Sequence, residues 1–238
     1  MPMSLRTILA TIGSSFFPAL CIYCGKENKW LCVECTKKAE PFPHAVCPAC
    51  DARAIDGKLE DSCTEKTGLT RFFCAYPLKN PVVRALVHTY KYRYGSTLHE
   101  TISALLAQWL KFQNAGGLFD DSFVIVAVPL HKARLNARGF NQSELLARDF
   151  AQYFAVPLLT NVLARTKNTP SQLEVHNKIA RSQNMQNAFE VTKNDALKGS
   201  RVILIDDVYT SGATMRECAA ALRKAGAREV WGVAFARG

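Results

Sequence analysis

The sequence predicts an α/β fold in which helices cover both faces of a parallel sheet, preceded by a small cysteine-rich module. Two segments, residues 122–153 and 202–226, predict the sheet, because each begins as an apolar strand and continues as a polar loop and an amphipathic helix. The third observation is that eight of the nine cysteines lie within residues 21–74. Six of these form Cys-x-x-Cys pairs, a spacing typical of metal-binding modules.

Length and composition limit the organisation of the chain. At 238 residues it can bury one core and carry a smaller appendage. We expect an N-terminal helix at 1–20, a zinc-binding module at 21–70 and the α/β domain at 71–238. The 30 lysines and arginines outnumber the 20 aspartates and glutamates, and the resulting net charge of +10 favours a polyanionic partner. The sequence has no run of eighteen apolar residues, so we expect no membrane span.

The first two cysteine pairs predict a metal centre. They consist of Cys21, Cys24, Cys32 and Cys35. Two such turns present four sulfurs to one ion, and a tetrahedral set of four thiolates is the preference of structural zinc. Redox chemistry fits less well, because a thioredoxin-type Cys-x-x-Cys occurs once, beside a βαβ pattern. Zinc would supply folding free energy to this small module, and the metal-type spacing favours a reducing, cytoplasmic location.

A second cysteine group resembles part of another such site and consists of Cys47, Cys50 and Cys63. The position for a fourth ligand at Cys-x-x-Cys spacing holds Lys66, and lysine is not a zinc ligand. Three interpretations stay open. Either Cys74 or His44 completes the site, or the site has decayed, or the pairs interleave. Cys74 lies in an apolar, strand-like stretch, which favours a buried thiol.

The α/β domain begins with two expected helices, at 81–90 and 98–109, whose apolar residues recur at helical spacing. An apolar strand at 122–128 is stopped by a proline. A basic loop over 130–142 then leads into a helix whose inward face we assign to Leu146, Phe150 and Tyr153.

Basic residues are expected to face the ligand edge of this sheet. Arg134 and Arg138, four residues apart in the loop, could both grip a pyrophosphate, since guanidinium groups match phosphate oxygens. The alternative is a solvated charged loop. A later polar segment containing Arg165, Lys167 and Arg181 is consistent with a flap over a charged ligand, and equally with a surface hairpin.

The strand at 202–205 leads to the candidate ligand site. Asp206 and Asp207 follow it at the carboxyl end, where open α/β sheets bind ligands. A helix is expected from about residue 214, and its free N–H groups suit a monophosphate. The carboxylates suit sugar hydroxyls or a divalent cation, unless the pair is simply exposed on an ordinary strand–turn–helix. The hydroxyl-rich loop between strand and helix comprises Thr210, Ser211, Gly212, Ala213 and Thr214.

Residues 202–214 resemble the whole signature of type I phosphoribosyltransferases, which bind phosphoribosyl pyrophosphate (PRPP). The resemblance implies that Asp206 and Asp207 contact the ribose hydroxyls and that 210–214 hold the 5′-phosphate. Tyr209 replaces the small aliphatic residue usual in this signature, a change that could narrow the pocket.

Nearly the whole chain also resembles the ComF/GntX family of bacterial competence proteins. The resemblance implies a cytosolic role in natural transformation, in which incoming single-stranded DNA is handled alongside a helicase-like translocation ATPase and recombination loaders. The residues that carry it are the cysteine module, Tyr90-Lys91-Tyr92, Val128-Pro129-Leu130, Arg138-Gly139-Phe140-Asn141-Gln142, Arg165-Thr166 with Gln172, and Arg181 with Asn184.

Two functions follow from these observations. In the first, which we favour, the chain binds PRPP and its basic surface tracks single-stranded DNA, with Lys91, Tyr92 and Arg93 as candidate contacts. In the second, the chain is an active phosphoribosyltransferase that binds PRPP with Mg²⁺ and transfers the phosphoribosyl group to an unidentified nucleobase or nucleotide. Arg134 and Arg138 would then stabilise the departing pyrophosphate. The sequence shows no evident general base for such a reaction.

Overall fold

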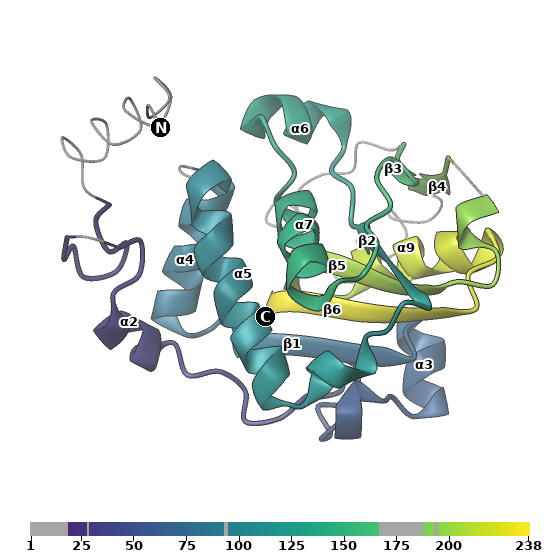
Figure 1. Cartoon of the computed structure of the whole chain (residues 1–238), viewed down its shortest axis with the longest axis horizontal. Helices are drawn as coiled ribbons and strands as arrows, with labels where there is room; N and C mark the ends of the chain where they lie inside the picture. Colours follow the sequence, from purple (N-terminus) through teal and green to yellow (C-terminus); the bar gives the residue numbers. More distant parts are fainter. Residues whose placement is uncertain (1–18, 28, 93–94, 167–187, 193–194) are drawn as a thin grey trace, which may run out of the picture.

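The computed structural model describes residues 19–27, 29–92, 95–166, 188–192 and 195–238 (Figure 1). Its helices are α2 (Val33–Lys38), α3 (Asp61–Thr67), α4 (Pro81–Tyr92), α5 (Gly95–Phe112), α6 (Lys132–Arg138), α7 (Gln142–Phe154) and α9 (Ala213–Lys224), with 3₁₀ turns η1 (Ile55–Gly57), η2 (Ala115–Leu118) and η3 (Asp195–Leu197). Its strands are β1 (Arg71–Pro77), β2 (Phe123–Ala127), β3 (Leu163–Arg165), β4 (Phe189–Val191), β5 (Arg201–Tyr209) and β6 (Glu229–Arg237).

A four-stranded parallel sheet in the order β1-β6-β5-β2 forms the centre of the fold. The predicted strands at 122–128 and 202–205 are β2 and β5, and they are direct neighbours, with Ala127 opposite Ile205. Both strands therefore open their carboxyl ends at the same edge. A separate antiparallel pair, β3 with β4, lies outside this sheet.

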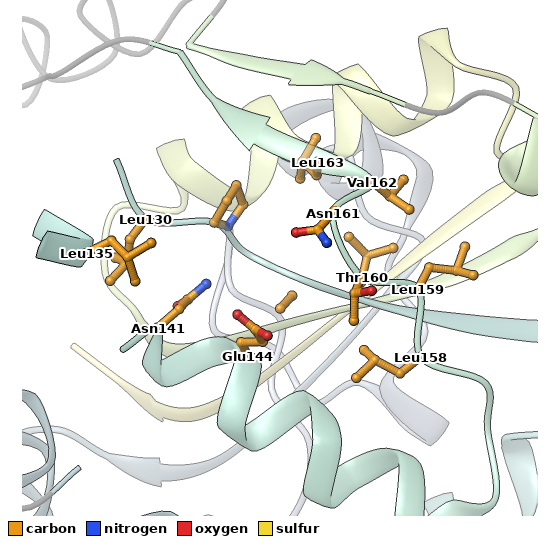
Figure 2. Close-up of a pocket in the computed structure, with 13 residues that line it drawn as sticks. Leu130, Leu135, Asn141, Glu144, Leu158, Leu159, Thr160, Asn161, Val162 and Leu163 are labelled. Atoms are coloured by element: carbon orange, nitrogen blue, oxygen red, sulfur yellow. The ribbon is translucent and has the colours of Figure 1, made fainter. Parts of the chain in front are cut away.

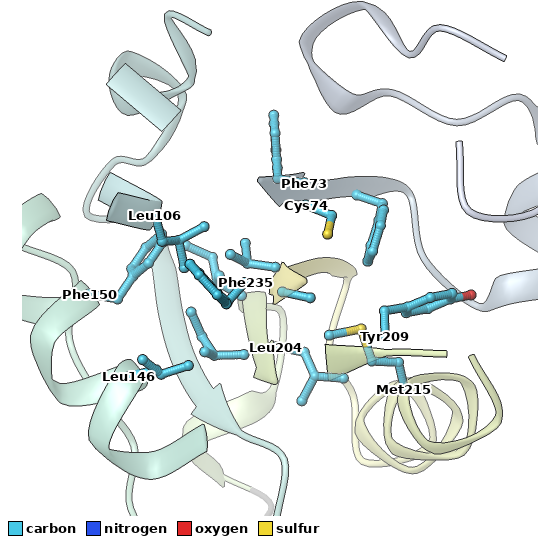
Figure 3. Packing of buried hydrophobic residues seen from close by; sticks show 14 of the residues in the cluster. Phe73, Cys74, Leu106, Leu146, Phe150, Leu204, Tyr209, Met215 and Phe235 are labelled. Atoms are coloured by element: carbon cyan, nitrogen blue, oxygen red, sulfur yellow. The ribbon is translucent and has the colours of Figure 1, made fainter. Parts of the chain in front are cut away.

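Helices cover both faces of the sheet, as the sequence predicts. Figure 3 shows Leu106 of α5 with Leu146 and Phe150 of α7 on one side of the strands, and Met215 of α9 on the other. The apolar runs of β5 and β6 are buried along almost their whole length, because a parallel strand between two helical layers has no solvent face.

The amino ends of the strands are closed by an aromatic and charged cluster. The Arg201 guanidinium carbon lies 3.9 Å from the ring centre of Phe123, and Arg201 Nε donates to Glu229 Oε2 at 3.1 Å. The Trp231 indole N–H donates to Glu229 Oε1 at 2.7 Å.

The cysteine-rich segment packs directly on this domain. Asn80 Nδ2 donates to the Lys38 carbonyl at 2.8 Å, and Trp109 Nε1 donates to the Phe42 carbonyl at 2.7 Å. Arg237, at the end of β6, forms an ion pair with Asp51 and donates to the Cys47 carbonyl at 3.3 Å. The predicted module at 21–70 and the sheet therefore share an interface that is held by side-chain donors.

Several sequence-based expectations are refined or fall outside the described residues. The expected helix after the basic loop is α7, whereas part of the stretch predicted as a loop is itself helical, as α6. Tyr153 of α7 does not face inward as expected, because Phe154 takes that position against Phe119 and Tyr153 is 44% exposed. The expected helix at 1–20 lies almost entirely outside the described residues. Within the parts of the chain that the structure does describe, no helix has the length and apolar character needed to cross a membrane.

Gly232, in the middle of β6, offers a test of this packing. A Cβ at Gly232 would lie 2.8 Å from Leu69 Cδ1 and 3.0 Å from Phe72 Cδ2. We expect Gly232→Ala to lower the free energy of unfolding by about 1–3 kcal/mol, because both neighbours are fully buried. Gly117→Ala, which meets no atom within 4 Å, is the control. Equal urea midpoints for the two variants would contradict the packing described.

Candidate phosphoribosyl site

Two adjacent carboxylates lie at the carboxyl end of β5. The Asp206 carboxylate accepts hydrogen bonds from the Ser143 hydroxyl at 2.8 Å and from the Asp207 N–H at 2.9 Å. Asp207 is buried, with 9% of its surface exposed. Ser143 sits in the first turn of α7, which packs over β5, so the helix fixes the orientation of Asp206.

A lysine from another element neutralises the second carboxylate. Lys91 Nζ, in the last turn of α4, lies 2.9 Å from Asp207 Oδ2. Lys91 was a predicted DNA contact, and the structure brings it to the acid pair instead of leaving it alone on the surface. The exposed ring of Tyr92 lies beside it in the chain, with 59% of the residue accessible. Arg93 lies outside the described residues.

The charge state of the pair is shaped by burial. Loss of hydration and the neighbouring Asp207 carboxylate raise the pKa of Asp206 to about 7, while the Ser143 hydrogen bond and the Lys91 charge act to lower it. At neutral pH Asp206 is therefore close to its own midpoint, and any ligand that needs the ionised form is favoured by higher pH.

The loop after the pair leads into α9 through a glycine. Gly212 is the N-cap of α9 and has a left-handed φ of 74°. A Cβ there would lie 2.0 Å from the Tyr209 hydroxyl oxygen, so the position requires glycine. Tyr209 is buried with its ring 4.7 Å from that of Phe72, which makes it a support of the loop. The Ser211 hydroxyl is buried and has no hydrogen-bond partner among the described residues.

The Arg138–Gln142 stretch joins the end of α4 to the start of α7. Arg138 Nη1 donates to Gln142 Oε1 at 3.1 Å, and its guanidinium carbon lies 5.3 Å from the centre of the Tyr92 ring. The Tyr90 hydroxyl donates to the Gln142 carbonyl at 2.7 Å. The two motifs that carry the family resemblance, at 90–92 and 138–142, thus form one wall beside the acid pair.

A further arginine, Arg165, lies within electrostatic reach of Asp206. Burial and then the positive charge of Arg134 lower the pKa of Arg165, while the negative charge of Asp206 acts against them. Arg134 is in α6 and Arg165 ends β3, so the predicted pyrophosphate loop lies near the start of the predicted flap, and Arg165 is the flap residue that senses Asp206. The other two flap residues, Lys167 and Arg181, lie outside the described residues.

The first cysteine cluster has the form of a metal site. The sulfurs of Cys21, Cys24, Cys32 and Cys35 all lie within 4.8 Å of one another, an arrangement that could hold a metal ion such as zinc. Burial acts to raise the pKa of Cys21, but N–H donors from Cys32, Cys24 and Tyr23 outweigh it and lower the pKa to about 6. A thiolate is therefore available at neutral pH, as metal binding requires.

The second cysteine group also gathers in space. The sulfurs of Cys47, Cys50 and Cys63 lie within 4.8 Å of one another, and that group contains neither Cys74 nor His44. Cys74 lies in β1, and burial raises the pKa of its thiol to about 12, as befits a core residue. The expectation of a buried Cys74 is met.

A pocket of about 150 Å³ lies at the β2 edge of the sheet (Figure 2). Leu130, Leu135, Leu158 and Leu163 contribute to its apolar wall, and Asn141 and Glu144 to its polar side. Glu144 is held by Arg148 at 2.6 Å. The lining includes neither aspartate, so this pocket is separate from the acid pair.

Part of the chain matches a known domain. Residues 141–237 match the phosphoribosyl transferase domain, and this stretch holds α7, β5, the acid pair and the loop at 210–214. Together with the parallel sheet and its helical layers, the match confirms the predicted fold of the type I phosphoribosyltransferases. The B. subtilis glutamine PRPP amidotransferase structure, complexed with ADP and GMP, is similar over 62% of this chain and 30% of its own, with 22% identity and a TM-score of 0.40.

Within that class, relatives of known name confirm the resemblance to the ComF/GntX competence proteins. Competence protein F of Haemophilus influenzae is 28% identical over 93% of this chain and 99% of its own. The DNA utilization protein YhgH of Escherichia coli is 29% identical over 90% of this chain and 96% of its own. Competence protein ComFC of Bacillus subtilis is 27% identical over 84% and 81%.

Some residues of the site escaped the sequence analysis. Ser143 was not identified, although it follows directly after the Arg138–Gln142 motif and sits where a helix begins. The pairing of Lys91 with Asp207 was not expected either. A polar residue in the first turn of a helix that follows a parallel strand is the signal that could have pointed to Ser143.

The raised pKa of Asp206 predicts a pH-dependent loss of stability. Between the ordinary pKa of 3.8 and about 7, the folded protein holds a proton that the unfolded chain has released, so stability falls as the pH rises through this window. Asp206→Asn stays neutral, and we expect it to gain about 2 kcal/mol over the parent between pH 5 and pH 8. Urea unfolding at both pH values measures the difference, with the exposed Asp121→Asn as the control. A constant difference would contradict the predicted pKa.

Proposed function

We propose that this protein binds PRPP at the acid pair and the loop at 210–214, and acts in natural competence by handling incoming single-stranded DNA in the cytoplasm. The observation that carries PRPP binding is that an acid pair with a buried Asp207, a left-handed Gly212 and the start of a twelve-residue helix follow one another in a single strand–loop–helix unit. This succession supplies acceptors for sugar hydroxyls and donors for a phosphate within one loop.

The residues present fit such a ligand. The buried Ser211 hydroxyl, without a partner among the described residues, would gain one from a phosphate oxygen. Asp206 and Asp207 would accept hydrogen bonds from the ribose hydroxyls. Mg²⁺ bound with PRPP would offset the charge of its pyrophosphate. Arg134 and Arg138 would contact that pyrophosphate, and Arg165, with Lys167 and Arg181 of the flap, would close the site.

The cysteine clusters fit a structural role beside this site. In this proposal Zn²⁺ is held by Cys21, Cys24, Cys32 and Cys35 and supplies folding free energy to residues 21–70. Residues 71–238 then form the phosphoribosyltransferase-like domain. Four thiols kept free for a metal also favour the reducing cytoplasm.

The DNA-handling role is supported by the relatives and by charge. Two relatives are named competence proteins and another a DNA utilization protein. The chain carries a net charge of +10, and Lys26, Lys37 and Lys38 of the cysteine segment are exposed. The exposed Tyr92 ring beside Arg138 offers a stacking surface for a base. A DNA translocation ATPase and a recombination loader are the partners that this role implies.

PRPP binding is tested by calorimetry on the metal-loaded chain in the presence of Mg²⁺. We expect saturable binding, and a loss of at least about tenfold in affinity for Asp207→Ala, because a charged hydrogen bond is worth about 1.5–3 kcal/mol. Asp121→Ala is the control. Absence of PRPP binding by the folded parent would refute the proposal.

The second candidate, phosphoribosyl transfer, is favoured by the match of residues 141–237 to the transferase domain. It is separated from simple binding by measuring pyrophosphate release from bound PRPP with nucleobases, nucleotides and DNA ends as acceptors. Release that depends on an acceptor and is lost in Asp207→Ala would establish the enzyme. PRPP binding without release would establish the binding protein.

DNA binding is tested by fluorescence anisotropy of a labelled single-stranded oligonucleotide. We expect affinity to fall steeply with salt and to survive Asp207→Ala. Tyr92→Ala should weaken binding by about 1–3 kcal/mol through lost stacking. Tyr153→Ala, which removes another exposed tyrosine, is the matched control. Equal effects of the two tyrosine variants would remove Tyr92 from the DNA surface.

A further inference from the structure

The two Cys-x-x-Cys turns at Cys21 and Cys47 are built on the same backbone plan. In each, the N–H of the first cysteine donates a hydrogen bond to the carbonyl of the residue five positions later. The acceptor is Lys26 at 2.7 Å in the first turn and Ala52 at 2.8 Å in the second. In each, the carbonyl of that cysteine accepts from the residue four ahead, Gly25 at 2.8 Å and Asp51 at 3.1 Å. An antiparallel bridge flanks each turn, Leu20 with Glu27 and Val46 with Arg53.

The second turn keeps this plan at a cost. The fifth residue of each turn is left-handed, with φ of 75° at Gly25 and 63° at Asp51. A non-glycine residue in that conformation costs about 1 kcal/mol or more. Arg237 offsets the cost, since it pairs with the Asp51 carboxylate and also donates to the Cys47 carbonyl at 3.3 Å. The second turn is therefore an intact metal-binding turn, and the interpretation of a decayed site does not explain it.

The helices that complete the two clusters are equivalent as well. In the first cluster Cys32 is the N-cap of α2, and Cys35 is the third helical residue. In the second cluster Glu60 is the N-cap of α3, and Cys63 is the third helical residue. Backbone angles agree closely, with φ −74° and ψ 160° at Cys32, and φ −67° and ψ 157° at Glu60. Glu60 thus occupies the position that a ligand occupies in the first cluster.

We propose that Cys47, Cys50 and Cys63, with the Glu60 carboxylate as fourth ligand, form a second zinc site. The sulfurs of Cys50 and Cys63 are already 3.6 Å apart. Glu60 is exposed, and as the N-cap of α3 it lies one helical turn before Cys63. Three thiolates and one carboxylate are all established zinc ligands and complete a tetrahedron. Glu60 precedes Cys63 at the spacing of a Cys-x-x-Cys pair, whereas Lys66 follows Cys63 at the same spacing.

The test is a metal count on the purified full-length chain, followed by cadmium substitution. We expect two zinc ions per chain and, after exchange to ¹¹³Cd, two NMR resonances, one typical of four sulfur ligands and one of three sulfurs and an oxygen. Glu60→Gln should weaken metal binding at the second site by at least about tenfold and shift only its resonance. Glu65→Gln, an exposed glutamate on the same helix, is the matched control. Glu60→Cys should convert the second resonance to the four-sulfur type.

One metal ion per chain would overturn the site. Two ions with a second resonance that Glu60→Gln and Glu60→Cys leave unchanged would overturn Glu60 as its ligand. None of these measurements uses PRPP or DNA, so their outcome is independent of the proposed function. The variants also retain Cys47, Cys50 and Cys63, so no variant removes a cysteine on which folding could depend.

Discussion

The site depends on keeping two adjacent carboxylates at the carboxyl end of a buried strand. Taking such groups out of water is costly unless partners compensate for the lost hydration. Here the compensation comes from two helices that are far apart in the chain: α7 supplies the Ser143 hydroxyl and α4 supplies the Lys91 ammonium. Because the end of α4 and the start of α7 both lie beside the carboxyl end of β5, the charge of the acid pair is compensated there. The hydrogen bonds within the wall formed by 90–92 and 138–142 hold these two helix ends together.

The two ends of the sheet carry different kinds of side-chain contact. At the amino ends, the Arg201 guanidinium lies over the Phe123 ring and donates to the Glu229 carboxylate, so its charge is compensated within the fold. At the carboxyl ends lie the acid pair and a loop in which Tyr209 leaves room only for glycine at position 212. The proposed ligand site is at the carboxyl edge, where open α/β sheets bind their ligands.

The parts of the fold that depend on local sequence could be predicted, and the parts that depend on packing could not. The strand at 202–205, the acid pair and the Gly212 turn are neighbours in the chain, so their pattern is visible in it. The Lys91–Asp207 and Ser143–Asp206 contacts join distant residues, and no local pattern encodes them. Tyr153 was assigned inward by helical spacing, but the aromatic cluster of Phe119 and Phe150 selects Phe154. The equivalence of Glu60 and Cys32 rests on backbone angles and helix position, which cysteine spacing does not report.

The interface between the cysteine segment and the sheet has a consequence for the history of the chain. Trp109, Asn80 and Arg237 of the sheet domain all donate to carbonyl groups of the segment that precedes it. Separating the two parts would leave these donors without their acceptors and would uncover the end of β6. The cysteine segment is therefore not an interchangeable attachment that recombination could exchange for another, and the two halves are expected to be inherited as one unit.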